Sequence, residues 1–387
     1  MKRTSLLLLA AALLAGGCGT AQPAAAPAGA VQTQAAPVKE PLVLTYDGGL
    51  YVLDGDTLKV AEDIPLPGFN RVNPAGDDRH VLVSTATGFR VLDAVTPELK
   101  DDEFTGDKPG HVVRHAGKTV LFSDGTGQVT VFDPHDLADG LPEGETYQAA
   151  APHHGVALQL ADGELVVTLG TEEERKGILV LDRDRKEITR SEDCPGVHGE
   201  ATAEGEAVVV GCEDGVLVYR DGKITKVESP DRYGRIGNQA GTGNSPIVLG
   251  DYKKDPDAEL ERPEQVSLID TRTGELRLVD LGTSYSFRSL ARGPHGEALV
   301  LGTDGAIHVI DAEKGEVVAR HAVVGEWREP LDWQRPRPAL FVRGHVAYVT
   351  DPAGKRVYAV DVESGRTLRT ATLPASPNEV TGVVDGH

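Results

Sequence analysis

Apolar and polar residues alternate along most of this 387-residue chain in short runs, which are separated by Gly, Asp and Asn. Examples of these runs are "HVLVST", "QVTVFD", "LVVTLG" and "GILVLD". A period of two places every second side chain on the same face of a strand, and Gly or Asp between two such runs favours a hairpin turn. Because almost no stretch has the spacing of an amphipathic helix, the pattern predicts an all-β protein built from antiparallel hairpins.

The hairpins recur with a regular spacing. A tripeptide of two small or apolar residues followed by Asp occurs at 91–93, 131–133, 180–182, 268–270, 309–311 and 359–361. The steps between these positions are 40, 49, 88, 41 and 50 residues, and the step of 88 contains a further copy, "VLVYRDG" at 216–222. A four-stranded unit of about 40–45 residues is typical of a β-propeller blade.

The number of blades follows from the inner strands. Seven complete units are expected to begin their inner strands near residues 70, 111, 154, 198, 238, 288 and 337. The remaining material lies at the two ends, where 42–66 supplies three strands and 378–387 supplies one. We therefore expect an eight-bladed propeller over 42–387, with four antiparallel strands per blade and one blade closed by the N- and C-terminal strands. A seven-bladed propeller is the alternative.

The N-terminal segment has a different pattern. "MKRTSLLLLAAALLAGGC" (1–18) combines basic residues, an apolar run and small residues before Cys18, which is typical of a secretory signal and too short for a membrane span. Its end resembles a bacterial lipobox, so we interpret 1–17 as a lipoprotein signal peptide and Cys18 as the lipidated residue. Ordinary signal-peptide cleavage is the alternative. Residues 18–41, rich in Ala, Pro and Gln, are expected to form a flexible tether.

This N-terminus and the charge limit the surroundings of the protein. We expect an exported, extracytoplasmic monomer that contacts the cell membrane only through the lipid on Cys18. The 60 acidic and 39 basic residues give a formal charge of −21, which argues against nucleic acid as a partner and is compatible with cations. Cys194 and Cys212 are expected to form a disulfide in an exported protein. Metal ligation by the reduced pair is the alternative.

The inner strands also indicate a site. They line the central channel of a propeller, so the residues at their starts meet at one mouth. Three consecutive blades supply His111, His154 and His198, the last two in the similar phrases "PHHGVAL" and "GVHGEAT". The other blades supply polar residues, with the arginines expected to hold carboxylates or an anion opposite the histidines: Arg71, Asn238, Gln239, Arg288, Arg337, Asn378 and Glu379.

Three converging imidazoles are a donor set typical of Zn²⁺. A further ligand is expected from a neighbour in the sequence, and the candidates are His153, Glu200 and Asp107. Because imidazole binds a metal only when it is neutral, the affinity is expected to fall as the pH drops through about 6.5. The alternative is that these polar side chains only line a wet channel.

We do not expect an enzyme, because the chain contains no nucleophile elbow, no glycine-rich phosphate loop and no Cys-x-x-Cys motif. Two alternatives stay open, since propellers host many functions. One is a metal-dependent, lactonase-like hydrolase in which Glu200 acts as the general base. The other is a scaffold for protein interactions without metal. Turnover of lactones or phosphoesters would identify the first, and absence of tight metal binding the second.

The lipobox, the propeller and the phrases "PHHGVAL", "CPGVHGEA" and "VGCEDGVLVY" together resemble the AztD family of extracytoplasmic zinc chaperones, over most of 42–387. The resemblance implies a propeller that binds Zn²⁺ through His111, His154 and His198. It also implies transfer of the Zn²⁺ to the solute-binding protein of a zinc-uptake ABC transporter. Family members can carry a His-rich N-terminal segment, whereas residues 19–40 contain no histidine. That departure puts a second, flexible metal site in doubt.

Overall fold

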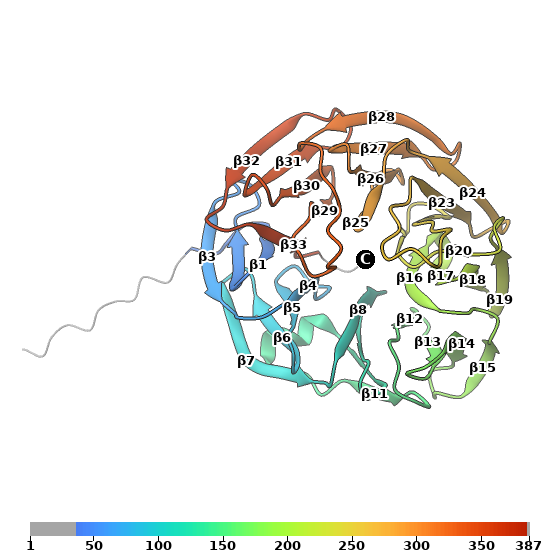
Figure 1. Cartoon of the computed structure of the whole chain (residues 1–387). Coiled ribbons are helices and arrows are strands. Elements are labelled where there is room, and N and C mark those ends of the chain that lie inside the picture. The colour runs from blue at the N-terminus through green and yellow to red at the C-terminus, as the bar shows by residue number, and fades with distance from the viewer. Residues whose placement is uncertain (1–35, 385–387) are drawn as a thin grey trace, which may run out of the picture. The chain divides into compact units, whose positions relative to one another are not determined.

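The alternating runs form the antiparallel hairpins that their pattern predicts. A computed structural model describes residues 36–384, which form eight antiparallel sheets of four main strands arranged as blades around a central channel (Figure 1). This confirms the all-β, eight-bladed propeller and excludes the seven-bladed alternative. Within the described residues, no helix is long and apolar enough to cross a membrane.

Seven of the eight blades formed by residues 36–384 follow one another along the chain, each built from its inner strand outwards. They consist of β4 (Arg71–Pro74), β5 (His80–Ser84), β6 (Gly88–Asp93) and β7 (Glu98–Thr105); β8 (Pro109–His115), β9 (Lys118–Ser123), β10 (Gln128–Phe132) and β11 (Glu145–Gln148); β12 (Ala157–Gln159), β13 (Leu165–Gly170), β14 (Arg175–Leu181) and β15 (Glu187–Ser191); β16 (His198–Ala203), β17 (Ala207–Cys212), β18 (Asp214–Arg220) and β19 (Lys223–Glu228); β21 (Gln239–Ala240), β22 (Ile247–Gly250), β23 (Gln265–Asp270) and β24 (Glu275–Asp280); β25 (Tyr285–Arg292), β26 (Ala298–Gly302), β27 (Ala306–Asp311) and β28 (Glu316–Ala322); and β29 (Leu340–Arg343), β30 (Val346–Asp351), β31 (Arg356–Asp361) and β32 (Thr367–Thr372). Short elements in the connections are the 3-10 helices η1 (Pro134–Asp139) and η2 (Glu204–Glu206), and β20 (Gly234–Arg235), which pairs with β18 in parallel.

The remaining blade joins strands from the two ends of the described chain. Its outer strands are β1 (Leu42–Tyr46), β2 (Gly49–Leu53) and β3 (Val60–Pro65), and its inner strand is β33 (Pro377–Gly382). β33 pairs antiparallel with β1, so that Leu42 lies opposite Gly382. Figure 1 shows β33, in red, next to β1, in blue. The predicted closure by the N- and C-terminal strands is therefore confirmed.

The middle strands of the blades carry the core. All five residues of β5 and all six of β17 are buried, because a middle strand contacts a neighbouring blade on each face. The outer strands β3 and β32 are mostly exposed. A middle strand therefore appears in the sequence as a nearly continuous apolar run, and an outer strand as a polar one.

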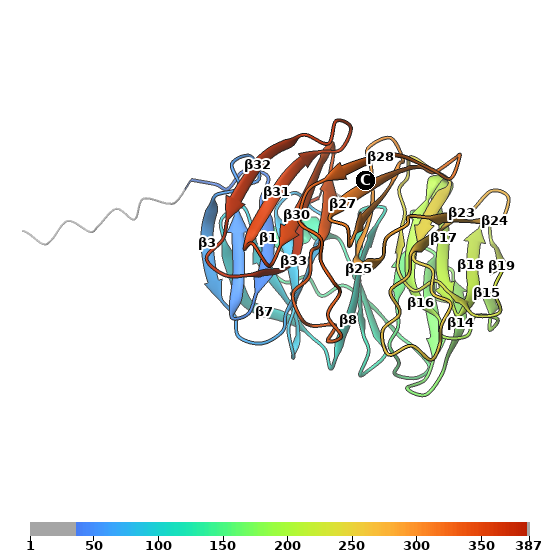
Figure 2. The same ribbon diagram turned by 45° about the horizontal axis from the view of Figure 1, so that its top comes forward.

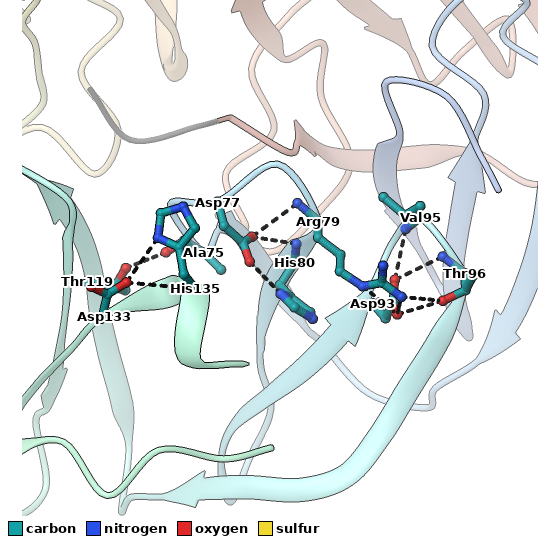
Figure 3. Close-up of polar contacts among 10 residues, drawn as sticks. All are labelled: Ala75, Asp77, Arg79, His80, Asp93, Val95, Thr96, Thr119, Asp133 and His135. Carbon is teal, nitrogen blue, oxygen red and sulfur yellow. Dashed lines mark hydrogen bonds and ion pairs between the residues drawn. The ribbon is translucent and has the colours of Figure 1, made fainter. Parts of the chain in front are cut away.

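The repeated Asp closes the turn that follows the third strand of a blade. Asp93 Oδ1 accepts hydrogen bonds from the backbone N–H of Val95 at 3.1 Å and of Thr96 at 2.9 Å (Figure 3). Asp133 accepts from the N–H of His135 in the same way (Figure 3). In the same way, four further carboxylates accept a backbone N–H bond, from Lys186 to Asp182, from Arg272 to Asp270, from Lys314 to Asp311 and from Ser364 to Asp361. The repeat is thus a turn signal of the kind that Asp side chains provide, not a binding motif.

The channel has two distinct mouths. The strands of each blade run between the two faces of the propeller (Figure 2), so all inner strands begin at one mouth and end at the other. We call the mouth where they begin the first mouth and the mouth where they end the second mouth. The turn between the first and second strands of a blade, and the turn between the third and fourth, lie on the face of the second mouth.

Cys194 and Cys212 form the expected disulfide. Both residues are fully buried, and Val197 is buried beside them in the same apolar cluster. The bond ties the segment that enters β16 to the end of β17. It therefore braces the chain immediately before His198, which is the first residue of β16.

Replacing both cysteines with alanine is expected to lower the free energy of unfolding by about 3 kcal/mol, because opening a loop of this size restores entropy to the unfolded chain. Urea unfolding of the oxidised wild type and of the variant measures the difference. Reduction of the wild type should reproduce the shift, and reductant should leave the variant unchanged. A loss below about 1 kcal/mol would contradict the expectation.

The predicted signal peptide 1–17, Cys18 and the tether up to residue 35 lie outside the described residues. At the end of the predicted tether, Val38 is buried and its N–H donates to the carbonyl of Val95 at 2.8 Å. Packing against the propeller therefore begins before Pro41, ahead of the boundary expected from composition.

Candidate metal centre

The structure brings His111, His154 and His198 together at the first mouth. His111 lies in β8, His154 precedes β12, and His198 opens β16, so three neighbouring blades each supply one ring. The ring centres are 5.0 to 5.5 Å apart. One nitrogen from each ring lies within 4.8 Å of the others. We call these three residues the histidine cluster.

Hydrogen bonds fix the orientation of two rings. His154 Nδ1 lies 2.5 Å from Asp124 Oδ2, and His198 Nδ1 lies 2.5 Å from the carbonyl oxygen of Gly237. A carbonyl and an ionised carboxylate only accept hydrogen bonds, so both Nδ1 atoms act as donors. In the neutral rings, the lone pairs therefore reside on the Nε2 atoms. Acceptors of this kind commonly orient histidines that bind a metal.

The two lone pairs face each other. The Nε2 atoms of His154 and His198 are 3.0 Å apart, an arrangement that is repulsive unless a proton or a cation lies between or beside them. Two nitrogens on one tetrahedral Zn²⁺, with bonds of about 2.0–2.1 Å, would be separated by about 3.3 Å. The observed separation is close to this value. The protein thus holds two donor atoms near the positions of two corners of a zinc tetrahedron.

The electrostatic surroundings disfavour protons on the rings. Burial lowers the pKa of His111 well below its usual value, and the neighbouring His198 and His154 lower it further. Burial also lowers the pKa of His198 to about 3, although the Gly237 carbonyl acts in the opposite direction. Neutral imidazole is the form that binds a metal.

Glu200 lies beside the cluster. Its Oε2 is 3.8 Å from His111 Nδ1, and its backbone follows His198 after one intervening residue in β16. Burial raises the pKa of Glu200 to about 8. A carboxyl group with such a pKa holds its proton near neutral pH and releases it when a cation stabilises the charged form.

Glycines explain the repeated His-Gly phrase. Gly199 has φ +69°, and a Cβ there would lie 2.3 Å from Gln239 Oε1. A Cβ on Gly155 would lie 2.4 Å from the ring of Phe122. Each histidine is therefore followed by a position that is too crowded for a side chain, and at Gly199 the backbone is also left-handed.

β-bulges complete the local geometry. The pairing register shifts between His198 and Glu200 in β16, and between Pro109 and Val112 in β8. A bulge re-aims the side chains around it. It also explains why His111 stands about one residue out of the repeat seen for His154 and His198.

Two of the predicted further ligands lie elsewhere. His153 is 2% exposed and packs edge-on against Phe122, and its nitrogens contact the Ala151 carbonyl at 2.9 Å and Thr168 Oγ1 at 3.0 Å. These contacts turn His153 into the blade, away from the neighbouring His154. Asp107 is exposed and does not join the histidine cluster within the described part of the chain. Of the three candidates, Glu200 is the one beside the cluster.

The arginines hold carboxylates of the protein, as expected for that side of the ring. Glu379 Oε1 accepts from Arg71 Nε at 2.9 Å and from Arg288 Nη2 at 3.0 Å. Arg288 also donates to Asn378 Oδ1. Both guanidinium groups thus share one carboxylate, which offsets one of their two positive charges.

Asp124 and the Gly237 carbonyl are parts of the site that sequence reasoning missed. Asp124 lies in the turn between β9 and β10, where an Asp is common for local reasons, and a backbone carbonyl leaves no trace in residue identity. One trace of Asp124 in the sequence is Gly110, the residue before His111. A Cβ at Gly110 would lie 2.2 Å from Asp124 Oδ1, so the absence of a side chain there leaves room for the carboxylate.

Replacing Asp124 with asparagine is expected to weaken metal binding roughly 10–100-fold, the range usual for loss of a charged acceptor behind a ligating histidine. Zinc titration against a competing chelator measures the change. The matched control is Asp107→Asn, which makes the same substitution at an exposed carboxylate nearby that is not part of the histidine cluster. Equal losses in both variants would contradict the role of Asp124.

Comparison with known proteins shows which proteins this chain is similar to. No family model matches the chain. In sequence, the zinc chaperone AztD of Citrobacter koseri is 26% identical over 303 residues, which cover 76% of this chain and 69% of that protein. Among solved structures, apo AztD and a second crystal structure of AztD from Citrobacter koseri each have a TM-score of 0.76 and 22% identity, and cover 89% of this chain and 97% of their own.

A more distant structure shares the fold alone. The dihydro-heme d1 dehydrogenase NirN in complex with DHE has a TM-score of 0.62 and 13% identity, covering 89% of this chain and 75% of its own. The resemblance indicated by the sequence is confirmed: this chain resembles the zinc chaperone AztD in sequence over about three quarters of its length and in fold over most of it.

Proposed function

We propose that this protein is an extracytoplasmic zinc chaperone that binds one Zn²⁺ at the first mouth through His111, His154 and His198. It would deliver the ion to the solute-binding protein of a zinc-uptake ABC transporter, as a monomer held at the cell membrane by a lipid on Cys18. The observation that carries this proposal is the pair of Nε2 lone pairs 3.0 Å apart, oriented by Asp124 and Gly237.

Several features support the zinc chemistry. Two neutral imidazoles already aligned by acceptors need little reorganisation to bind a cation. Depressed pKa values at His111 and His198 keep these donors free of protons. Glu200 supplies a carboxyl group beside His111. The name of the relative, a zinc chaperone rather than an enzyme, agrees with the expectation that this chain has no catalytic activity.

The position of the cluster suits release as well as binding. His154 has a side chain that is 46% exposed, whereas that of His111 is 24% exposed. A docked partner can therefore approach the ion from the side of His154 and offer its own ligands before the other imidazoles dissociate. Such stepwise exchange avoids a free aqueous ion, and it requires an open edge to the site.

Two measurements test the proposal. Calorimetric titration of the metal-stripped protein with Zn²⁺ should show one tight equivalent, which the His111/His154/His198 triple alanine variant should lack. The zinc-loaded protein should then load the metal-free solute-binding protein in the presence of a chelator that traps free Zn²⁺. No tight equivalent would reject the site. Tight binding without protected transfer would reject the chaperone role and leave a zinc-binding propeller.

The pKa shifts predict unusual behaviour at low pH. Two imidazoles with ordinary pKa values of about 6.5 would together lose roughly 70-fold in metal affinity between pH 7 and 5.5. Because the pKa values of His111 and His198 are lowered, protons compete at these rings only at lower pH. In the Glu200→Gln variant, where no carboxyl proton competes with the metal, we therefore expect the affinity to fall by less than about tenfold over this range, in place of the decline through pH 6.5 predicted from sequence. Chelator competition at both pH values measures it, and a 70-fold loss would contradict the shifts.

A further inference from the structure

A second group of metal-binding side chains lies on the other face of the propeller. His295 stands in the turn between β25 and β26, His345 in the turn between β29 and β30, and Glu363 in the turn between β31 and β32. These are first-to-second and third-to-fourth strand turns of two adjacent blades, so they lie on the face of the second mouth. We call the three residues the rim cluster.

The side chains of the rim cluster converge on one oxygen. Glu363 Oε1 lies 3.1 Å from His295 Nε2 and 3.1 Å from His345 Nδ1. The two imidazole ring centres are 5.5 Å apart, and the three potential ligand atoms lie within 4.8 Å of one another. Separations slightly above 3 Å between donors are those of adjacent corners around a small divalent cation.

The turns that carry these residues are held by backbone hydrogen bonds. The N–H of Val362 donates to the carbonyl of His345 at 3.0 Å, which ties two of the three turns together. Asp361 closes the turn of Glu363 through the N–H of Ser364 at 2.8 Å. The N–H of His295 donates to Glu297 Oε2 at 3.0 Å. The scaffold is therefore ordered even though the side chains are open to solvent.

Exposure makes the rim cluster accessible. The side chains of His295, His345 and Glu363 are 62%, 57% and 57% exposed. Gly293, Pro294 and Gly344, which neighbour the two histidines in sequence, line a hollow of about 510 Å³. The cluster thus stands at the rim of a polar depression, where an ion can arrive without any rearrangement of the blades.

We propose that the rim cluster is a second, weaker site for Zn²⁺, formed by two imidazoles and one carboxylate with water completing the shell. A set of two histidines and one glutamate is an established zinc donor set that leaves a position open. An ordinary His–Glu contact needs only one imidazole, whereas here two blades direct a ring at the same carboxylate oxygen. The overall charge of −21 favours the approach of a cation. This site is independent of the histidine cluster.

Zinc titration of the full-length, metal-stripped protein separates the two sites. We expect one tight and one weaker equivalent in the wild type. His345→Ala and Glu363→Gln should each weaken only the second equivalent, by roughly tenfold or more, and the triple alanine variant of the histidine cluster should lose only the first. Glu363→Gln keeps the shape of the side chain and one acceptor oxygen, so a weaker second equivalent in this variant reports the lost carboxylate and not a loss of the fold.

The outcomes distinguish the two proposals. If the weaker equivalent persists unchanged in both His345→Ala and Glu363→Gln, or if the wild type binds a single equivalent that the histidine-cluster variant abolishes, the rim site is rejected and the chaperone proposal stands. If the tight equivalent is missing but a weaker one depends on His345 and Glu363, the rim site stands and the chaperone proposal is rejected.

Discussion

Replacing His198 with alanine is expected to weaken zinc binding at the first mouth by at least about a hundredfold, because it removes a ligand itself and not merely a group behind one. The loss has two parts. The ion loses one nitrogen donor, and His154 loses the facing lone pair 3.0 Å away that makes a cation favourable between the rings. The Gly237 carbonyl is then left without the N–H donor that it has at 2.5 Å.

Zinc titration against a chelator measures this change, and His115→Ala is the matched control. His115 lies on the same strand as His111 but at its far end, where its Nε2 contacts Glu206 Oε1 at 2.9 Å. The control should bind Zn²⁺ like the wild type. An affinity of His198→Ala within about threefold of the wild type would remove His198 from the site.

Replacing Glu379 with alanine is expected to destabilise the fold by about 3–5 kcal/mol, the range for removal of one partner from a buried ion pair. The side chains of Glu379 and Arg288 are only 8% and 6% exposed, and their atoms lie 3.0 Å apart. Glu379 also accepts from Arg71 at 2.9 Å and from the N–H of Val72 at 3.2 Å. Burial lowers the pKa of Arg288 to about 10, as expected for a guanidinium that has little contact with water.

Urea unfolding of Glu379→Ala and of the exposed control Glu98→Ala tests this expectation. Glu98, in the outer strand β7, is 64% exposed and pairs with Lys100. The control should lose less than about 0.5 kcal/mol, as is usual for surface positions. A second variant, Glu379→Ala combined with Arg288→Met, should recover part of the loss, because no buried charge then lacks its partner. Equal stability of Glu379→Ala and Glu98→Ala would contradict the argument.

The fold could be predicted because each blade repeats the same pattern of buried strands and closed turns. Middle strands are buried on both faces and therefore apolar, and the third strand ends in an Asp that closes its turn through backbone N–H groups. The closing blade followed from the same reasoning, since 42–66 lacks an inner strand that β33 provides. The residue at which packing against the propeller begins was predicted less well from composition. Val38 is buried, although it lies within a segment whose composition otherwise resembles a linker.

The candidate site could be predicted only where it coincides with the repeat. His154 and His198 recur at the start of inner strands, and topology brings such starts to one mouth. Asp124 and the Gly237 carbonyl come from turns and backbone, which carry no repeated phrase. The orientation of His153 depends on which side of the chain faces the channel, and neighbours in sequence do not reveal that.

The rim cluster was also hidden from sequence reasoning. His295, His345 and Glu363 stand in three turns of two blades. His295 and His345 are one blade step of 50 residues apart, but Glu363 stands in a third-to-fourth strand turn, which meets the two histidines only once the blades are in place. Their convergence is a property of the assembled ring.

The origin of β33 has a consequence for how the ring is completed. The strand that pairs with β1 is the last strand of the described chain, and it carries Glu379, whose carboxylate forms ion pairs with both Arg71 and Arg288 inside the channel. Until β33 has been made, β1 presents an unpaired edge, and Arg71 and Arg288 lack the carboxylate that they share. Pairing of β33 with β1, closure of the circle and arrival of the carboxylate that both arginines share therefore coincide in one event. A chain that ends early would fail in all three respects at once, and a protease could recognise it by its open edge.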